Sequence, residues 1–217
     1  VLYEKHFMEL SNLIIEREYD FNIWAYARID TVKEKYLDTL KKAGVNWLAL
    51  GIESGNTTVR KDVVKGKFTE FNITDLVRQV QDAGINVIGN YIFGLPEDNV
   101  ETMQETLDLA KDLNCEFANF YCTMAYPGSK LYLDAIAENH TLPNTYSGWS
   151  QHSYDMIPLD TKHIGASEIV RFRDNAFNDY HEDEKYLSMI EGKFGIETRN
   201  KMVDMCEYKL KRKLLGD

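Results

Sequence analysis

The chain has 217 residues, with 25 Lys and Arg against 35 Asp and Glu, so its formal net charge is −10 at pH 7. Hydrophobic residues make up 44% of the sequence and aromatic residues 12%, which is enough for a packed core and excludes a disordered or low-complexity chain. The acidic balance argues against a general nucleic-acid binder, because contacts to phosphates need Lys and Arg on one face. No apolar stretch reaches the roughly 20 residues of a membrane helix and no secretory signal opens the chain, so we expect a cytoplasmic protein.

Strands and helices are predicted to alternate between residues 21 and 124. Nearly unbroken apolar and β-branched runs predict strands over 21–27, 45–52, 85–93 and 117–124. Apolar residues at helical spacing predict helices over 32–44, 59–66, 74–84 and 99–113, with Gly44, Thr74 and Asn99 as capping residues. Neighbouring parallel strands need crossovers of this length, so the pattern predicts an α/β fold with a parallel sheet.

The pattern changes after residue 131 to turns and then to two or three helices, which predicts a C-terminal helical appendage. The two units expected are therefore 1–135 and 136–217. The last helix is expected over Arg199–Leu215, and we interpret its basic residues (Lys209, Lys211, Arg212 and Lys213) as cations near a helix C-terminus rather than as an anionic-surface patch. The three cysteines, Cys115, Cys122 and Cys206, are widely separated and odd in number, so we expect reduced thiols.

Polar and glycine clusters follow three of the predicted strands where each strand ends. They are Arg28 with Asp30, Glu53 with Ser54, and the segment 90–97. In parallel α/β sheets, ligands bind at this edge because loops and helix N-termini converge there. Each cluster alone is also explained by an ordinary turn or cap, but three clusters on one edge favour a binding site.

Four motifs in register resemble one enzyme family. They are GIESG at 51–55 after an apolar strand, KGK at 65–67, YIFGLPE at 91–97 and YPGSKLY at 126–132. In order and spacing they are similar to the radical S-adenosylmethionine (SAM) enzymes, and most similar to the branch that often carries an upstream cobalamin-binding domain. The resemblance covers residues 21–132, about half of the chain.

The resemblance implies a partial (β/α) barrel of the radical SAM type, of which strands three to six are present, holding a 4Fe–4S cluster and SAM at its mouth. It implies an enzyme that uses the reduced cluster to cleave SAM and start radical chemistry, such as methyl transfer, cyclisation or rearrangement. The substrate is a small molecule or a lipid-like or tetrapyrrole-like compound, and cobalamin is a further cofactor of the resembled branch. An electron donor such as flavodoxin or ferredoxin is the implied partner, with no nucleic acid and no membrane span.

Carried over position by position, the family's SAM contacts fall on Arg28, Glu53, Ser54, Lys65, Asn90, Ile92, Gly94 and Glu97. Glu53 and Ser54 match the motif for the ribose and amino-acid parts of SAM, and a carboxylate suits that task. Ile92 and Gly94 match the motif near the adenine, which Glu97 completes, while Asn90 departs from it by standing where the first glycine is usual. For Arg28 an ion pair with Asp30, and for Lys65 an exposed position at a helix end, remain alternatives.

The family's CxxxCxxC loop, whose thiolates hold the cluster, appears nowhere in the sequence. In the family this loop follows the first strand, so we expect it upstream of Val1, and we expect this fragment alone to be inactive.

An ordinary (β/α) barrel enzyme is a poorer interpretation, because neither eight repeats nor a glycine-rich phosphate loop is visible. A truncated, non-catalytic barrel that acts as an interaction module is the alternative. For the substrate pocket, the candidates in the appendage are Trp149, His152, Tyr154, His163 and His181.

Overall fold

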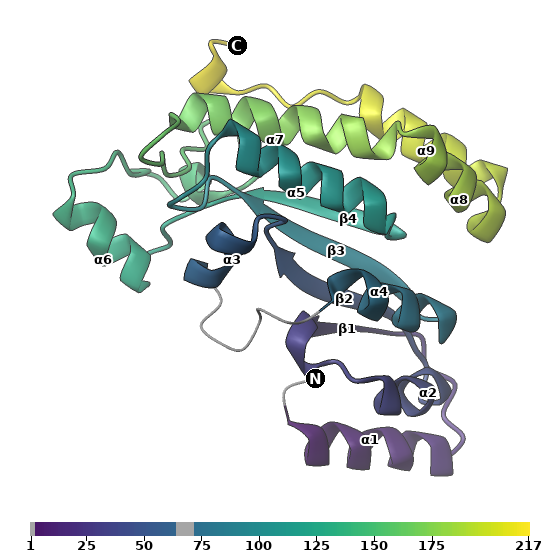
Figure 1. Ribbon diagram of the computed structural model, residues 1–217. Coiled ribbons are helices and arrows are strands. Elements are labelled where there is room, and N and C mark those ends of the chain that lie inside the picture. Colours follow the sequence, from purple (N-terminus) through teal and green to yellow (C-terminus); the bar gives the residue numbers. More distant parts are fainter. Residues whose placement is uncertain (1–2, 64–71) are drawn as a thin grey trace.

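A four-stranded parallel sheet organises the protein, and the computed structural model describes residues 3–63 and 72–217 (Figure 1). The strands lie in chain order, as β1 (Ile23–Arg28), β2 (Val45–Glu53), β3 (Asn86–Phe93) and β4 (Phe117–Cys122). The crossovers contain α2 (Glu34–Lys42), α3 (Thr57–Val63), α4 (Ile73–Asp82) and α5 (Val100–Leu113). This arrangement confirms the predicted α/β class and is that of a partial (β/α) barrel.

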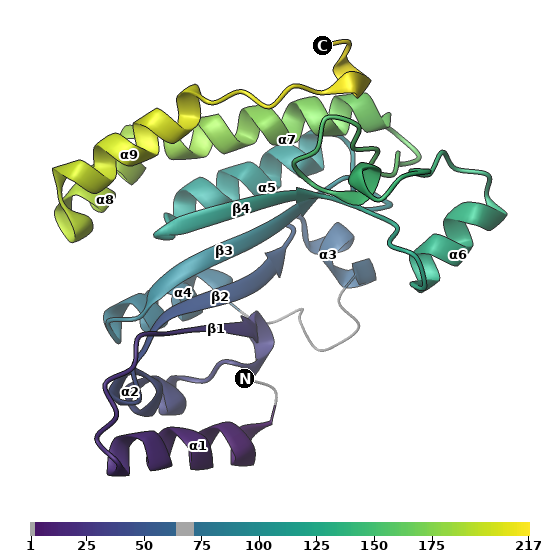
Figure 2. The ribbon, with the colours of Figure 1, turned by 180° about the vertical axis from the view of Figure 1, so that it is seen from behind.

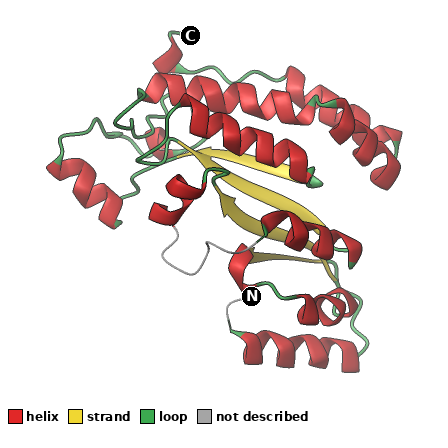
Figure 3. Cartoon of the chain, in the orientation of Figure 1, coloured by secondary structure: helices red, strands yellow, loops and turns green. Residues whose placement is uncertain are grey.

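The two faces of the sheet differ in what covers them. Helices α4 and α5 lie over the face seen in Figure 1, whereas Figure 2 shows the opposite face with the strands in front. Figure 3 distinguishes these helical and strand layers by colour. On the covered side, Leu48, Leu50 and Phe120 are buried, while Trp24 and Tyr26 on the opposite side of β1 are 54% and 69% exposed. Because successive side chains of a strand alternate, each strand contributes one row to the core and one to the open face.

Local sequence signals explain where most helices begin and end. Gly44 follows α2 with a φ of +89°, in the left-handed conformation that glycine adopts without strain. The predicted cap Asn99 begins α5, and its side chain and that of Thr102 form a reciprocal capping box. The expected cap at Thr74 is wrong, because Asn72 accepts from the backbone N–H of Asp75 and begins α4 two residues earlier.

The C-terminal part contains α6 (Lys130–Ala137), α7 (Ala166–His181), α8 (Glu184–Phe194) and α9 (Ile196–Glu207). Helix α7 lies along β4, and its residues Ile169, Val170 and Ala176 belong to the same buried cluster as the sheet (Figure 1). The predicted boundary between 135 and 136 stays a prediction, but the apolar core is continuous across it.

The predicted helix over Arg199–Leu215 is wrong in its second half. Helix α9 ends at Glu207, and the next residues are extended until a short 3₁₀ turn, Lys213–Leu215. The reason is Arg212, which is 1% exposed and donates to both carboxylate oxygens of Asp174 on α7. We call residues 208–217 the C-terminal strap, since this segment runs alongside α7 (Figures 1 and 2).

The outer edge of β4 is covered by side chains instead of by another strand. The Gln151 amide accepts from the Cys122 N–H at 3.0 Å and donates to the Cys122 carbonyl at 2.9 Å, as a neighbouring strand would. The Arg173 guanidinium donates to the Phe120 carbonyl at 2.7 Å. These contacts satisfy edge groups that would otherwise attract a further strand, so the sheet ends at β4.

At the other end of the sheet, α1 (Glu4–Glu16) packs on α2, where the rings of Phe7 and Tyr36 meet edge to face at 5.1 Å.

Among residues 3–63 and 72–217, no helix has both the length and the apolar character needed to cross a membrane.

Candidate functional site

A cavity of about 450 Å³ lies on the open face of the sheet, towards the carboxyl ends of the strands. All four strands contribute to its wall, which consists of Tyr26, Ala27, Arg28, Ala49, Gly51, Glu53, Asn90, Ile92 and Tyr121. Cavities of this size hold small-molecule ligands in other proteins. The strand order therefore brings Arg28, Glu53, Asn90 and Ile92, four residues proposed from the sequence, to one concave site.

Glu53 has an unusual backbone and an unusual environment. Its φ of +67° lies in the left-handed region, which is strained for a residue with a side chain, and the register between β2 and β3 shifts there. Burial raises the pKa of its carboxyl group above the ordinary value. No hydrogen bond or ion pair joins this carboxylate to any residue that the structure describes. A strained, half-buried and unsatisfied acid of this kind is typical of a ligand-binding position.

Gly51 makes room for that carboxylate. A Cβ atom at residue 51 would lie 2.5 Å from Oε1 of Glu53, so a larger residue here would displace the carboxylate from its present position over the strand. Gly51 pairs with Arg28 on β1 and with Asn90 on β3, and Asn90 pairs with Asn119 on β4. Arg28, Asn90 and Asn119 thus form one polar row across the open face, at the level of Gly51.

Arg28 and Asn90, two polar residues of this row, already form hydrogen bonds within the protein. Arg28 forms the ion pair with Asp30 that the sequence left as an alternative, through hydrogen bonds of 3.1 and 2.7 Å. Asn90 donates to the Leu50 carbonyl at 3.2 Å and accepts from Nδ2 of Asn119 at 3.1 Å. The side chain of Arg28 remains 52% exposed, so this ion pair leaves donors available at the cavity wall.

Ser54 points away from the cavity, although it follows Glu53 directly. It is fully buried, and its Oγ lies 3.2 Å from Oγ1 of Thr106 on α5. The same Thr106 oxygen accepts from the Gly55 N–H at 2.9 Å. A Cβ at Gly55 would approach the Glu105 carbonyl to 2.5 Å, so the turn lies tight against α5. Ser54 therefore fastens the turn that holds Glu53 in place.

The remaining sequence-predicted residues lie outside the cavity wall or outside the described chain. Gly94 has a φ of +75°, and a Cβ there would lie 2.7 Å from Cδ1 of Ile169 on α7, so close packing explains the glycine. Glu97 forms an ion pair with Lys162, whose hydrogen bond lowers the pKa of Glu97. Lys65 lies outside the described residues.

Tyr26, Tyr121 and Asn119 were not singled out from the sequence. The two-residue period of a strand places Tyr26 beside Arg28 on one face of β1, and Asn119 beside Tyr121 on one face of β4. That period was the available signal, but it does not say which face stays open. The sequence candidates of the appendage lie apart from this cavity wall: Trp149 packs beside Tyr126, and His181 is fully buried.

The cysteines do not fit an iron–sulfur cluster. Cys115, Cys122 and Cys206 are all free and buried, and burial raises the pKa of Cys115 and of Cys122 to about 12. Cluster ligation needs neighbouring thiolates. Within residues 3–63 and 72–217, no group of three or more His, Cys, Asp or Glu is placed to hold a metal ion. The prediction of reduced thiols is confirmed, and this part of the chain offers no cluster site.

Comparison with known proteins identifies the family of the chain. A family profile described as Radical SAM superfamily matches residues 2–110, half of the sequence. An uncharacterized methyltransferase of Pyrococcus horikoshii is 26% identical over 86% of this chain and 40% of its own length. A putative methylthiotransferase of Methanocaldococcus jannaschii is 33% identical over 46% of this chain and 22% of its own length.

A solved structure shows the same fold. It is a radical SAM methyltransferase, TsrM, from Kitasatospora setae with cobalamin and a 4Fe–4S cluster bound, and it is 21% identical. The match has a TM-score of 0.55 and covers 71% of this chain and 30% of that chain. The chain thus spans 40% or less of the length of each of these three proteins.

Proposed function

We propose, since the chain belongs to the radical SAM superfamily, that it is the SAM-binding part of a longer enzyme and that SAM lies in the cavity on the open face. The observation that carries the proposal is Glu53, whose backbone is strained and whose half-buried carboxylate has no partner among the described residues. The ammonium and ribose hydroxyl groups of SAM are donors that this carboxylate lacks. Membership of the family implies SAM and a 4Fe–4S cluster as cofactors.

The residues that line the cavity have distinct roles in this proposal. Glu53 accepts hydrogen bonds from the amino-acid part or the ribose, and Arg28 supplies donors for a carboxylate. Ile92 packs against the adenine, with Tyr26 and Tyr121 as further ring-sized contacts on the same face. The side-chain oxygen of Asn90 accepts one hydrogen bond from Asn119 and can accept a second from a polar group of the ligand. Ser54, Gly94 and Glu97 hold the loops, and Lys65 stays a candidate for the SAM carboxylate.

The cluster belongs to another part of the enzyme in this proposal, because the described cysteines do not fit it. A cluster held elsewhere in the enzyme would supply the electron for the cleavage of SAM, and a flavodoxin or ferredoxin is the proposed reductant. This chain's own residues bind SAM, orient it and exclude water from one side. The fragment by itself is proposed to be inactive. It is proposed to consist of two units, 1–135 and 136–217, and the protein is proposed to be located in the cytoplasm.

Methyl transfer is the reaction that the relatives favour. The proteins from Pyrococcus and Kitasatospora carry the name methyltransferase, and the latter binds cobalamin. We therefore propose methyl transfer ahead of cyclisation or rearrangement, with cobalamin as an additional cofactor and the substrate left as a small molecule.

One observation favours the alternative of a non-catalytic interaction module. Trp24 and Tyr26 stack at 5.6 Å on the edge strand β1, and both are more than half exposed. Apolar rings exposed at a sheet edge are typical of a surface that another segment covers. A chain that carries this surface and fails to bind SAM would be such a module.

The test is SAM binding by equilibrium dialysis with the chain and its Glu53→Gln variant. Loss of a charge-assisted hydrogen bond predicts affinity about tenfold weaker or worse in Glu53→Gln. Glu101→Gln, which changes an exposed acid in the first turn of α5, is the matched control and is expected to bind as the original chain does. Equal affinity in all three proteins, or no saturable binding up to about 10 mM SAM, contradicts the proposal.

A further inference from the structure

A second cavity, of about 470 Å³, lies away from the open face, between α7, the end of α9 and the C-terminal strap. Its polar lining comes from His152, Arg171, Arg173, Asp174, Asn175, Asn178 and Lys209. No residue is shared between this lining and the wall of the cavity that contains Glu53. The proposed function therefore leaves this second cavity without a role.

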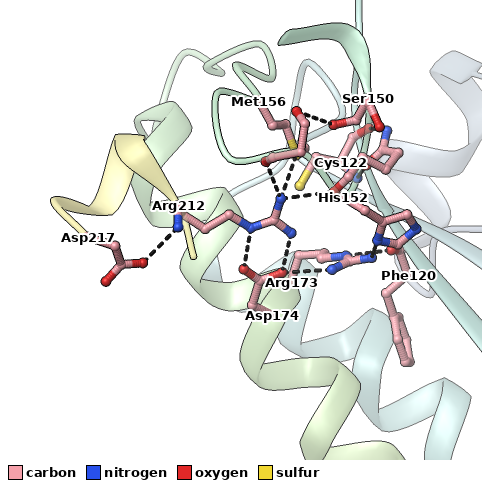
Figure 4. A network of polar contacts seen from close by, with 11 residues as sticks. Phe120, Cys122, Ser150, His152, Met156, Arg173, Asp174, Arg212 and Asp217 are labelled. Carbon is pink, nitrogen blue, oxygen red and sulfur yellow. Dashed lines mark hydrogen bonds and ion pairs between the residues drawn. The ribbon is translucent and has the colours of Figure 1, made fainter. Parts of the chain in front are cut away.

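A buried cluster with excess positive charge forms one side of this cavity (Figure 4). The Asp174 carboxylate accepts two hydrogen bonds of 2.9 Å from Arg212 and one of 2.7 Å from Arg173. Arg212 and Arg173 are 1% and 5% exposed, so two buried guanidinium groups share one carboxylate. The Asp217 carboxylate accepts from the backbone N–H of Arg212 and not from its guanidinium. The two guanidinium groups thus share a single carboxylate as their direct acceptor.

Two further cations, Arg171 and Lys209, line the cavity. The side chains of Arg171 and Lys209 form no hydrogen bond or ion pair with any residue in the described part of the chain. Arg173 directs Nη2 only towards Nδ1 of His152, at 3.5 Å, which is a long contact. Within the described lining, Asp174 is the one carboxylate. In a protein with a formal net charge of −10, such a concentration of unpaired cations indicates an anion.

The other side of the cavity is apolar. It is formed by Phe177, Met205, Tyr208, Leu210 and Leu215. The volume of about 470 Å³ is that of a small-ligand site, and aromatic side chains among the lining suit a flat ring. A ligand that is anionic at one end and flat and apolar at the other therefore matches both sides.

We propose that this cavity binds a phosphorylated small molecule with a flat ring, its phosphate held by Arg171, Arg173 and Lys209. A phosphate monoester carries close to two negative charges at neutral pH, which matches this excess of cations better than a carboxylate does. Arg and Lys donors recognise phosphate oxygens through charge-assisted hydrogen bonds. The buried Arg212 and its partner Asp174 keep the strap on α7 (Figure 4). This contact holds the strap residue Lys209 at the cavity.

The experiment measures binding of uridine 5′-monophosphate by calorimetry, since a uridine nucleotide does not carry the adenosyl group of SAM. Uridine, which lacks the phosphate, is the ligand control, and inorganic phosphate is the competitor. Arg171→Ala and Lys209→Ala are each expected to weaken the nucleotide by about tenfold, through loss of a charge-assisted hydrogen bond. SAM binding is expected to stay unchanged in both variants.

Two matched variants separate the site from general charge. Lys211→Ala removes an exposed cation of the same strap, and Arg78→Ala removes an exposed arginine of α4; neither residue lines the cavity. Both are expected to bind the nucleotide as the original chain does. The proposal is overturned by equal weakening in all four variants, by uridine binding as tightly as its monophosphate, or by no saturable binding of the nucleotide and of phosphate up to about 10 mM. Arg171 and Lys209 are exposed, so thermal melting curves are expected to show all four variants folded.

Discussion

Acid is expected to destabilise the protein through His181 in α7. This histidine is fully buried among the rings of Phe117, Phe177, Tyr180 and Tyr186. Its Nδ1 lies 2.9 Å from the Phe177 carbonyl, whereas Nε2 has no hydrogen-bond partner within the described structure. Burial lowers its pKa from 6.5 to about 4. The folded protein therefore holds this imidazole neutral at a pH where the unfolded chain protonates it.

The sign and size of the effect follow from proton linkage. As pH falls below the unfolded pKa, the unfolded state binds the proton that the folded state refuses, so the free energy of unfolding decreases. With a folded pKa of about 4, the loss from His181 between about pH 7 and about pH 5 is about 2 kcal/mol. His140 acts with the opposite sign, because its hydrogen bond with Asp160 raises its pKa. Burial, with Arg173 nearby, lowers the pKa of His152, which adds to the loss.

Urea unfolding at several pH values, followed by tryptophan fluorescence, isolates the contribution of His181. His181→Gln keeps a donor for the Phe177 carbonyl and cannot be protonated, so it is expected to be less stable at neutral pH but to lose less stability on acidification. The difference between the two slopes is expected to be about 2 kcal/mol over the interval. His163→Gln changes an exposed histidine and is the control. Parallel pH profiles of the original chain and His181→Gln would show that His181 is not the source of the acid sensitivity.

Two further predictions concern stability. Gly94→Ala places a Cβ 2.7 Å from Ile169 at a positive φ and is expected to cost about 3 kcal/mol of unfolding free energy. Gly128→Ala, also at positive φ but with open space around it, is expected to cost about 1 kcal/mol, and equal costs in urea unfolding would contradict the packing argument. Arg212→Met breaks a buried ion pair and is expected to cost about 3 kcal/mol, whereas Lys211→Met changes an exposed strap residue and is expected to cost almost nothing. A thermal melt of Arg212→Met that matches the original chain would show that the strap is not held by this residue.

The sequence predicted the regular part of the fold because its signals there are local. Apolar periodicity and the cap at Asn99 identify strands and helices from residues that are close together in the chain. The terminal helix was wrong because its end depends on Arg212 reaching Asp174, which lies 38 positions away. No local pattern carries information about such a contact.

The candidate site was predictable in location but not in detail. Clusters at strand ends indicated Arg28, Glu53 and Asn90 together, since parallel strands end at one edge. The opposite directions of Glu53 and Ser54 follow from the left-handed backbone at Glu53 and the hydrogen bond to Thr106, neither of which neighbouring residues reveal. Tyr26 and Tyr121 were missed because alternation along a strand does not identify the open face.

A crystal structure of the chain with SAM tests the central proposal most directly. We expect SAM in the cavity on the open face, with its ammonium or a ribose hydroxyl about 3 Å from the Glu53 carboxylate. Rings of Tyr26 or Tyr121, or the side chain of Ile92, are expected against the adenine. SAM bound elsewhere, or bound in the cavity with the Glu53 carboxylate still lacking a partner, would contradict the account.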